Sequence, residues 1–164
     1  MDFSQIAPVC KATGTLRKAR MGDATQLYKL INLHAGKGDM LPRTMNELFE
    51  NLRDFYVFEQ DEKIVACTAL HVLWEDLAEI KSLVVAESHQ GQGLGLLLVD
   101  RVLREAGELG IKRVFALTFK PKFFEKIGFS VIDKGELPQK VWGECVKCHL
   151  FPECQEIAVI KNMN

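Results

Sequence analysis

The sequence contains no long hydrophobic run and no excess of charge of either sign. No apolar stretch in its 164 residues approaches the roughly 20 residues of a membrane-spanning helix. Residues 1–5 lack the basic and then apolar pattern of a secretory signal. The formal net charge is −1, and basic residues alternate with acidic ones, which does not favour nucleic-acid binding. We therefore expect a cytoplasmic protein with no membrane or nucleic-acid partner.

Cysteine occurs in an odd number, five, and a reducing compartment argues against a framework of disulfides. Cys145, Cys148 and Cys154 lie near His149, with a spacing similar to that of zinc ligands. Adjacent cysteine and histidine residues rarely bind one ion together, so we assign no metal here. Zinc binding, reduced thiols that brace the loop, and a redox role remain alternatives for this cluster.

The stretch 79–106 reads as a strand, a glycine-rich turn and a helix. Residues 79–86 are rich in aliphatic and β-branched residues, and the apolar residues at 94, 97, 98, 102 and 106 have helical spacing. Gly91, Gly93 and Gly95 let the backbone approach a ligand at the start of that helix, where free N–H groups and the helix dipole favour an anion. The stretch predicts a pyrophosphate-binding turn, and a tight connection without a ligand is the alternative. Neither a Walker loop nor a Rossmann turn fits its spacing.

This turn resembles the Q/R-x-x-G-x-G/A signature of the GNAT superfamily of acetyl-CoA-dependent N-acetyltransferases, which Gln90, Gly93 and Gly95 match. The resemblance covers nearly the whole chain. The segments 41–44, 69–74, 114–118 and 123–129 are similar to the amino-acid N-acetyltransferases, the N-acetylglutamate synthases of arginine biosynthesis. The resemblance implies an α/β GNAT fold, in which helices flank a mixed, mostly antiparallel, splayed sheet. We expect one domain over residues 1–164, with the cysteine-containing loop at 134–155.

Local patterns predict the elements of such a fold. We expect strands at 15–19, 56–60, 63–70, 79–86, 113–117, 129–132 and 156–160, and helices at 24–33, 44–53, 94–106 and 122–126. Asp23 is the expected N-cap of the first helix, and Thr44 with Glu47 predicts a capping box at the second. Cys67, inside an apolar run, is expected to be a small core residue.

The resemblance also implies how acetyl-CoA is held. Backbone groups of Leu83, Val84 and Val85 would pair with the pantetheine arm, and the N–H of Val85 would serve the thioester oxygen. The pyrophosphate would be held by Gln90, Gly91, Gln92, Gly93, Leu94, Gly95 and Leu96.

Acetyl transfer to an amine also needs a group that accepts the proton the amine loses. Glu79 is the predicted general base, and several enzymes of the resembled superfamily carry a glutamate base at this place. Strand alternation is expected to put it on one face with Lys81, Leu83 and Val85. Partial burial should raise its pKa toward about 6–7. An ion pair with Lys81 or another surface cation is the alternative role.

The resembled family acts on L-glutamate, whose two carboxylates require cations. Arg43, Lys81 and Lys120 are the candidates, and Arg43 can bind a carboxylate through two hydrogen bonds. The predicted product is N-acetyl-L-glutamate. Two alternatives are acetylation of another amine (a protein N-terminus, a lysine or a polyamine) and a non-catalytic acyl-CoA-binding module. The cations argue against a cationic acceptor, and the intact base and turn argue against an inactive module.

Three points stay open in the sequence. Many GNAT enzymes place a tyrosine in the short helix as general acid, but this chain has Phe123 and Phe124, so the acid is unassigned. His71 is interpreted as a packed, hydrogen-bonded histidine, with pocket lining as the alternative. The expected partner is a small amino acid, and a homodimer remains possible.

Overall fold

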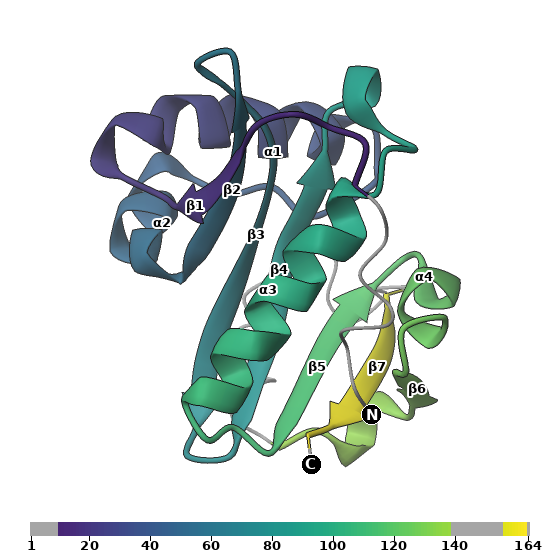
Figure 1. The fold of residues 1–164 in the computed structure, drawn as a ribbon. Helices are drawn as coiled ribbons and strands as arrows, with labels where there is room; N and C mark the ends of the chain where they lie inside the picture. The colour runs from purple at the N-terminus through teal and green to yellow at the C-terminus, as the bar shows by residue number, and fades with distance from the viewer. Residues whose placement is uncertain (1–9, 139–155, 164) are drawn as a thin grey trace.

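The computed structural model describes residues 10–138 and 156–163, which form a seven-stranded open sheet with helices on both faces (Figure 1). The strands are β1 (Thr15–Lys18), β2 (Phe55–Gln60), β3 (Lys63–Trp74), β4 (Leu77–Val85), β5 (Arg113–Thr118), β6 (Ser130–Ile132) and β7 (Ile157–Asn162). The helices are α1 (Ala24–Gly36), α2 (Met45–Glu50), α3 (Leu94–Glu108) and α4 (Pro121–Glu125). The strand order is β1-β2-β3-β4-β5-β7-β6, and β4–β5 is the parallel pair. The predicted mixed, mostly antiparallel sheet is confirmed.

Hairpins join β2 to β3 and β3 to β4. Asp61 and Glu62 both have positive φ, 51° and 64°, as a two-residue turn of the type that matches strand twist requires. Strand β3 runs four residues beyond the predicted end at 70, because Val72 and Trp74 still pair with β4. His71 interrupts the apolar run that marked the strand in the sequence, and residues 71–74 alternate between half-buried and exposed.

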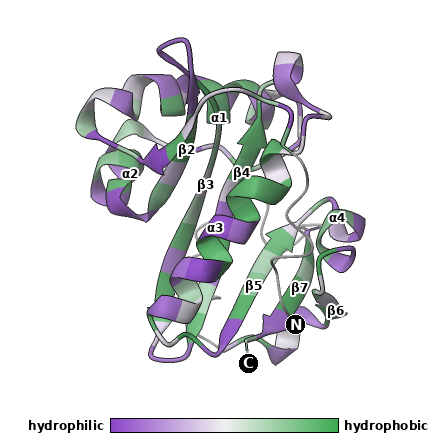
Figure 2. Cartoon of the chain, in the orientation of Figure 1, coloured by the Kyte–Doolittle hydropathy of each residue, from purple (hydrophilic) through white to green (hydrophobic). Residues whose placement is uncertain are grey.

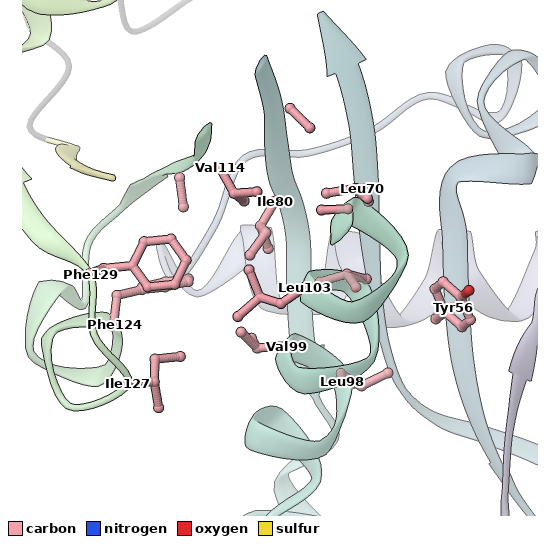
Figure 3. Packing of buried hydrophobic residues seen from close by; sticks show 14 of the residues in the cluster. Tyr56, Leu70, Ile80, Leu98, Val99, Leu103, Val114, Phe124, Ile127 and Phe129 are labelled. Atoms are coloured by element: carbon pink, nitrogen blue, oxygen red, sulfur yellow. The ribbon is translucent and has the colours of Figure 1, made fainter. Parts of the chain in front are cut away.

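Two hydrophobic layers cover the sheet. Helix α3 lies on one face, where Leu98, Val99 and Leu103 pack with Ile80 and Phe124 (Figure 3). Helices α1 and α2 cover the other face. Figure 2 shows the central strands as mostly hydrophobic and the turns as mostly hydrophilic. The sheet therefore presents an apolar surface on both sides.

Cys67 lies in the layer beneath α1 and α2, as predicted, and is fully buried. Burial raises the pKa of the Cys67 thiol well above its usual value, since a thiolate there would lose its hydration. The thiol is therefore a packing group, not a nucleophile.

The second helix begins as predicted and ends early. Thr44 Oγ1 accepts from the N–H of Glu47, whose carboxylate accepts from the N–H of Thr44, which confirms the capping box. The α-helix ends at Glu50 instead of residue 53, and a 3₁₀ turn, Leu52–Asp54, follows. The tighter turn brings the chain directly into β2 and leaves Asp54 at the end of β3.

Helix α1 begins after Asp23, but this side chain does not cap it. The carboxylate accepts two hydrogen bonds from the guanidinium of Arg17, at 2.7 and 3.0 Å, and one from the N–H of Arg20 at 2.7 Å. Arg17 also donates to Glu59 on β2 at 2.8 Å. The helix continues to Gly36 instead of residue 33. Asp23 thus ties β1 and β2 to the start of α1.

The Arg17 guanidinium holds the pKa of the Asp23 carboxyl below its usual value. Asp23→Asn should lower the free energy of unfolding by about 2–4 kcal/mol at pH 7, because it leaves a half-buried guanidinium without its anion. A carboxylate with a lowered folded pKa stabilises the fold above its unfolded pKa of about 3.9, and that stabilisation disappears as pH falls through the folded value. The difference between the two proteins should therefore shrink below about pH 4.

Urea unfolding at pH 7 and pH 3 measures this effect. Asp100→Asn is the matched control, because Asp100 pairs with Arg104 on the surface of α3 at 2.9 Å, and such a pair contributes about 0.3–0.5 kcal/mol. Equal losses in the two variants would contradict the anchoring role of Asp23.

Candidate active site

The candidate site is an opening between β4 and β5. Their parallel pairing covers three positions and ends where Glu79 lies opposite Phe115; beyond it the strands separate (Figure 1). A cavity of about 1480 Å³ lies there, which exceeds the roughly 300–1,000 Å³ of a typical small-ligand site. It extends from the turn before α3 to the loop before α2. The cavity can therefore hold a long ligand and a second, smaller one.

A β-bulge at Ser82 shapes the wall that β4 contributes. Ser82 has a φ of 54°, and the pairing with β3 shifts so that β4 carries one residue more than β3 at this point. Lys81 and Val84 therefore share the face toward α1 and α2, whereas Leu83 and Val85 pack toward α3. The predicted single face with Glu79, Lys81, Leu83 and Val85 is wrong beyond Ser82, because the extra residue reverses the alternation.

Glu79 lies in the cavity wall at the point where the two strands separate. Its exposed fraction is 7%, which agrees with the predicted partial burial. It is the cross-strand neighbour of His71 on β3, and both side chains line the cavity. The Nδ1 atom of His71 lies 2.6 Å from a carboxylate oxygen of Asp54. A buried carboxylate and a carboxylate-bound imidazole thus lie side by side.

The three predicted cations all line the same cavity: Arg43 before α2, Lys81 on β4 and Lys120 after β5. The backbone of Arg43 is held by the side-chain amide of Asn32 on α1, which donates to its carbonyl at 2.8 Å and accepts from its N–H at 3.1 Å. The Nε of Arg43 donates to the hydroxyl of Ser82 at 3.3 Å. The bulge and helix α1 together direct this guanidinium along the wall that carries Lys81.

The glycine turn has the backbone geometry of an anion site. Gly91 and Gly93 have φ of 79° and 88°, a conformation that favours glycine. The first hydrogen bond within α3 runs from Leu97 to the carbonyl of Gly93 at 3.0 Å, so the amides of residues 94–96 have no acceptor inside the helix. A Cβ on Gly95 would lie 3.4 Å from the ring of Phe123. The amides of residues 94–96 and the positive end of the 15-residue helix α3 therefore lie together, which favours an anion at the start of α3.

The end of β4 leads the chain from the strand into this turn. The N–H of Ala86 donates to Val65 on β3 at 2.8 Å, so strand alternation directs the N–H of Val85 the other way, into the opening. The side chain of Gln90 donates to the carbonyl of Val85 at 3.1 Å. Gln90 thus braces the strand end with its side chain, and contributes to the turn through its backbone.

One predicted cofactor residue lies apart from the others. Gln92 does not line the cavity, and its carbonyl accepts from the N–H of Lys11 at 3.1 Å. All other residues predicted to contact the cofactor or substrate do line it. The structure therefore brings together nearly the whole predicted set.

The short helix α4 offers no proton donor at the positions of its phenylalanines. Phe123 lines the cavity beside Gly95. Phe124 is buried and packs edge-on against Phe129, with ring centroids 5.2 Å apart (Figure 3). The general acid stays unassigned.

Two of the histidines that line the cavity are His71, which is hydrogen-bonded as interpreted from the sequence and also lines the pocket, and His34, which was not singled out. His34 on α1 is 4% exposed, its Nδ1 bonds to the carbonyl of Leu30 at 3.1 Å, and within the described ranges its Nε2 has no partner. The pairing of His71 with Asp54 joins residues 17 positions apart. No sequence period links those two residues, and a helix was predicted to end just before Asp54.

The predicted cysteine cluster, Cys145, Cys148 and Cys154, lies outside the described residues. Among residues 10–138 and 156–163, no group of three or more histidine, cysteine, aspartate or glutamate side chains is arranged to hold a metal ion. In the same part of the chain, no helix is both long and apolar enough to cross a bilayer.

A splayed α/β sheet with a glycine turn before the helix at its opening is the architecture of an acetyl-CoA-dependent acetyltransferase. The model of the acetyltransferase (GNAT) family matches residues 24–129, and the chain belongs to that family. The resemblance found in the sequence is confirmed.

The similar proteins include chains of about the same length and a much longer one. An amino-acid acetyltransferase of Mycobacterium tuberculosis is 36% identical over 137 residues, which are 82% of this chain and 78% of the relative. The structure of Rv2747 from the same organism, in complex with CoA, has a TM-score of 0.79 at 31% identity and covers 92% of this chain and 99% of that one. N-acetylglutamate synthase from Neisseria gonorrhoeae, complexed with coenzyme A and N-acetyl-glutamate, has a TM-score of 0.85 at 25% identity, covering 94% of this chain and 36% of the synthase. This chain thus spans little more than a third of the synthase.

The geometry of the turn leads to a prediction for CoA binding. Gly93→Val should reduce CoA affinity at least about tenfold, because a side chain at this position strains the left-handed backbone and displaces the amides of the turn. Gly110→Val is the matched control, since Gly110 has φ of 80° at the other end of α3, with open space around its Cβ position. Both variants carry a strain of about 1–3 kcal/mol.

Titration calorimetry with CoA, alongside thermal unfolding, separates strain from binding. We expect both variants to lose stability and Gly93→Val alone to lose CoA. A folded Gly93→Val protein with the affinity of the Gly110→Val control would contradict the role of the turn.

Proposed function

We propose that this acetyltransferase transfers the acetyl group of acetyl-CoA to the α-amine of L-glutamate, and so makes N-acetyl-L-glutamate for arginine biosynthesis. The observation that carries the proposal is the cavity at the β4–β5 opening. It combines a buried carboxylate, Glu79, with three cations and a turn of free amides. The amine attacks the thioester directly, with Glu79 as general base.

The cofactor half of the cavity fits acetyl-CoA. The pyrophosphate lies at the amides of residues 91–96, where the charge of the helix end is favourable. The pantetheine arm extends along residues 83–85 on the open edge of β4. The N–H of Val85 then polarises the thioester carbonyl, which develops negative charge as the amine adds. CoA bound to two relatives, one 31% and one 25% identical, supports this cosubstrate.

The acceptor half of the cavity fits a dicarboxylate. Arg43 holds one carboxylate through its terminal nitrogens, with its backbone fixed by Asn32 and its Nε on Ser82. Lys81 lies on the same wall and serves the second carboxylate, while Lys120 contributes positive charge from the loop after β5. A polyamine or a lysine side chain would meet these cations unfavourably. The synthase with bound N-acetyl-glutamate supports the same choice.

A panel of amino acids tests the substrate. CoA release from acetyl-CoA should be fastest with L-glutamate. Of the amines in the panel, only glutamate and aspartate carry two carboxylates and an α-amine. We expect glutamine, lysine and spermidine, which lack the second carboxylate, to give kcat/KM values at least about tenfold lower, as the loss of one charged hydrogen bond implies. Aspartate should also react more slowly, because its side chain is one methylene shorter and its second carboxylate reaches less far. Turnover of spermidine above that of glutamate would overturn the dicarboxylate pocket.

Two variants test the roles of base and cation separately. Glu79→Gln should lower kcat about 10²–10⁴-fold and leave CoA affinity unchanged, since the cofactor is held by backbone groups. Arg43→Ala should mainly raise the KM for glutamate, by an amount equivalent to roughly 2–5 kcal/mol if the carboxylate pair is desolvated.

Steady-state kinetics from pH 6 to 9 measures both variants. Near-normal turnover of Glu79→Gln over that range would remove this residue as the base. An unchanged glutamate KM in Arg43→Ala would show that the carboxylate lies elsewhere.

A further inference from the structure

A second proton acceptor lies next to Glu79. We propose that His71 takes one of the two protons that the substrate ammonium must lose, and that Asp54 positions its ring for this task. The proposal rests on the proposed function, since it concerns an amine acceptor in the same cavity. It assigns roles to two residues that the mechanism above does not use.

The proton balance of the reaction includes a second proton, which leaves before attack. A bound amino acid enters as an ammonium ion, RNH₃⁺, and leaves as the amide RNHCOCH₃. A C–N bond forms, the C–S bond breaks with its electron pair on sulfur, and two protons are released along with CoAS⁻. The first proton must leave before attack, because an ammonium nitrogen has no lone pair. Glu79 accepts one proton during attack, so the earlier proton goes to another side chain or to solvent.

The hydrogen bond to Asp54 fixes which nitrogen of His71 is the base. A carboxylate can only accept, so the Nδ1 of His71 carries the proton in the 2.6 Å contact. The neutral ring then has its lone pair on Nε2. Within the described part of the chain Nε2 has no hydrogen-bond partner, and the side chain lines the cavity with 27% of its surface exposed. The same arrangement of carboxylate and imidazole makes histidine a general base in hydrolases.

The position of His71 suits a proton acceptor for the amine. It pairs across the strands with Glu79, whose side chain lies on the same face of the sheet, and cross-strand partners have Cβ atoms about 4.5–5.5 Å apart. One amine nitrogen can therefore be reached by both groups, directly or through one water. An imidazole is also the side chain that exchanges protons most readily near neutral pH.

The charged groups around His71 come from three elements. Asp54 approaches from the 3₁₀ turn, Glu79 and Lys81 lie on β4, and Glu47 of α2 lines the same cavity. The carboxylate of Glu47 accepts from the N–H of Thr44. Asp54 is the group in direct contact with the ring, and it stabilises the imidazolium that forms when Nε2 takes up the proton.

A purely structural role predicts a different behaviour. The pair joins the turn before β2 to the end of β3, and each side chain is 27% exposed. Ion pairs with such exposure contribute about 0–1 kcal/mol to stability. If this were the sole role, loss of His71 would reduce activity by the same factor at every pH.

The pH dependence of the rate distinguishes the two roles. We expect His71→Gln to lower kcat/KM for the amino acid about 10–100-fold at pH 7, less than the roughly 10²–10⁴-fold typical of a general base in the transition state, because solvent can also take this proton. The ratio of wild-type to variant rates should then shrink toward one as pH is raised to 9.5, because solvent hydroxide deprotonates the amine instead. Glu79→Gln should show no such recovery, since the second proton is released only during attack.

Two further variants complete the test. Asp54→Asn should give a smaller loss at pH 7 with the same recovery at high pH, because the imidazole remains but its ring is no longer oriented. Asp100→Asn, which changes a carboxylate on the surface of α3, should match wild type at every pH. Calorimetry with CoA confirms that each variant is folded.

The outcomes separate this inference from the function itself. A constant ratio for His71→Gln between pH 7 and 9.5 would overturn the role of His71 and leave the proposed function standing. If wild type acetylates another amine but not glutamate, the substrate assignment fails, and the same pH series with that amine decides the role of His71. A wild-type enzyme that acetylates no amine would overturn both.

Discussion

The early end of the pairing between β4 and β5 is the constraint on which the site depends. Three parallel pairs hold the strands together up to Glu79, and beyond it, among residues 10–138 and 156–163, β4 pairs with β3 alone. An open strand edge presents amides and carbonyls that an extended ligand can pair with. The cavity, the orientation of the Val85 amide and the placement of the α3 turn all follow from this separation (Figure 1).

In the proposed function, the bulge at Ser82 lets one strand contact two ligands. Before it, Glu79 and Lys81 face the half of the cavity covered by α1 and α2; after it, Leu83 and Val85 face α3. Without the extra residue, side chains would alternate regularly, and the cations would lie on the same face as the groups beside the cofactor. The reacting amine and the thioester can instead approach from different directions and meet where the strands separate.

The sequence predicted what depends on local pattern. The order of elements, the capping box at Thr44 and the glycine turn are encoded by neighbouring residues, and all three are present. The bulge at Ser82 was not predicted, because only the pairing with β3 reveals an inserted residue. The contact of His71 with Asp54 was also missed, since it depends on where α2 ends. Tertiary contacts determine that α2 ends at Glu50, and the helix propensity of the sequence does not indicate this position.

Arg43 shows why a local pattern cannot define a binding site. An arginine in a loop loses much side-chain entropy when it is fixed, up to about 2 kcal/mol. Here Asn32 fixes its backbone and Ser82 accepts from its Nε, so much of that loss occurs on folding and not on substrate binding. Ser82 can accept because its left-handed backbone, φ 54°, turns the strand, at a cost of about 1–3 kcal/mol. The strained backbone at Ser82 therefore helps to fix the Arg43 guanidinium. Folding orients this side chain before the proposed substrate binds.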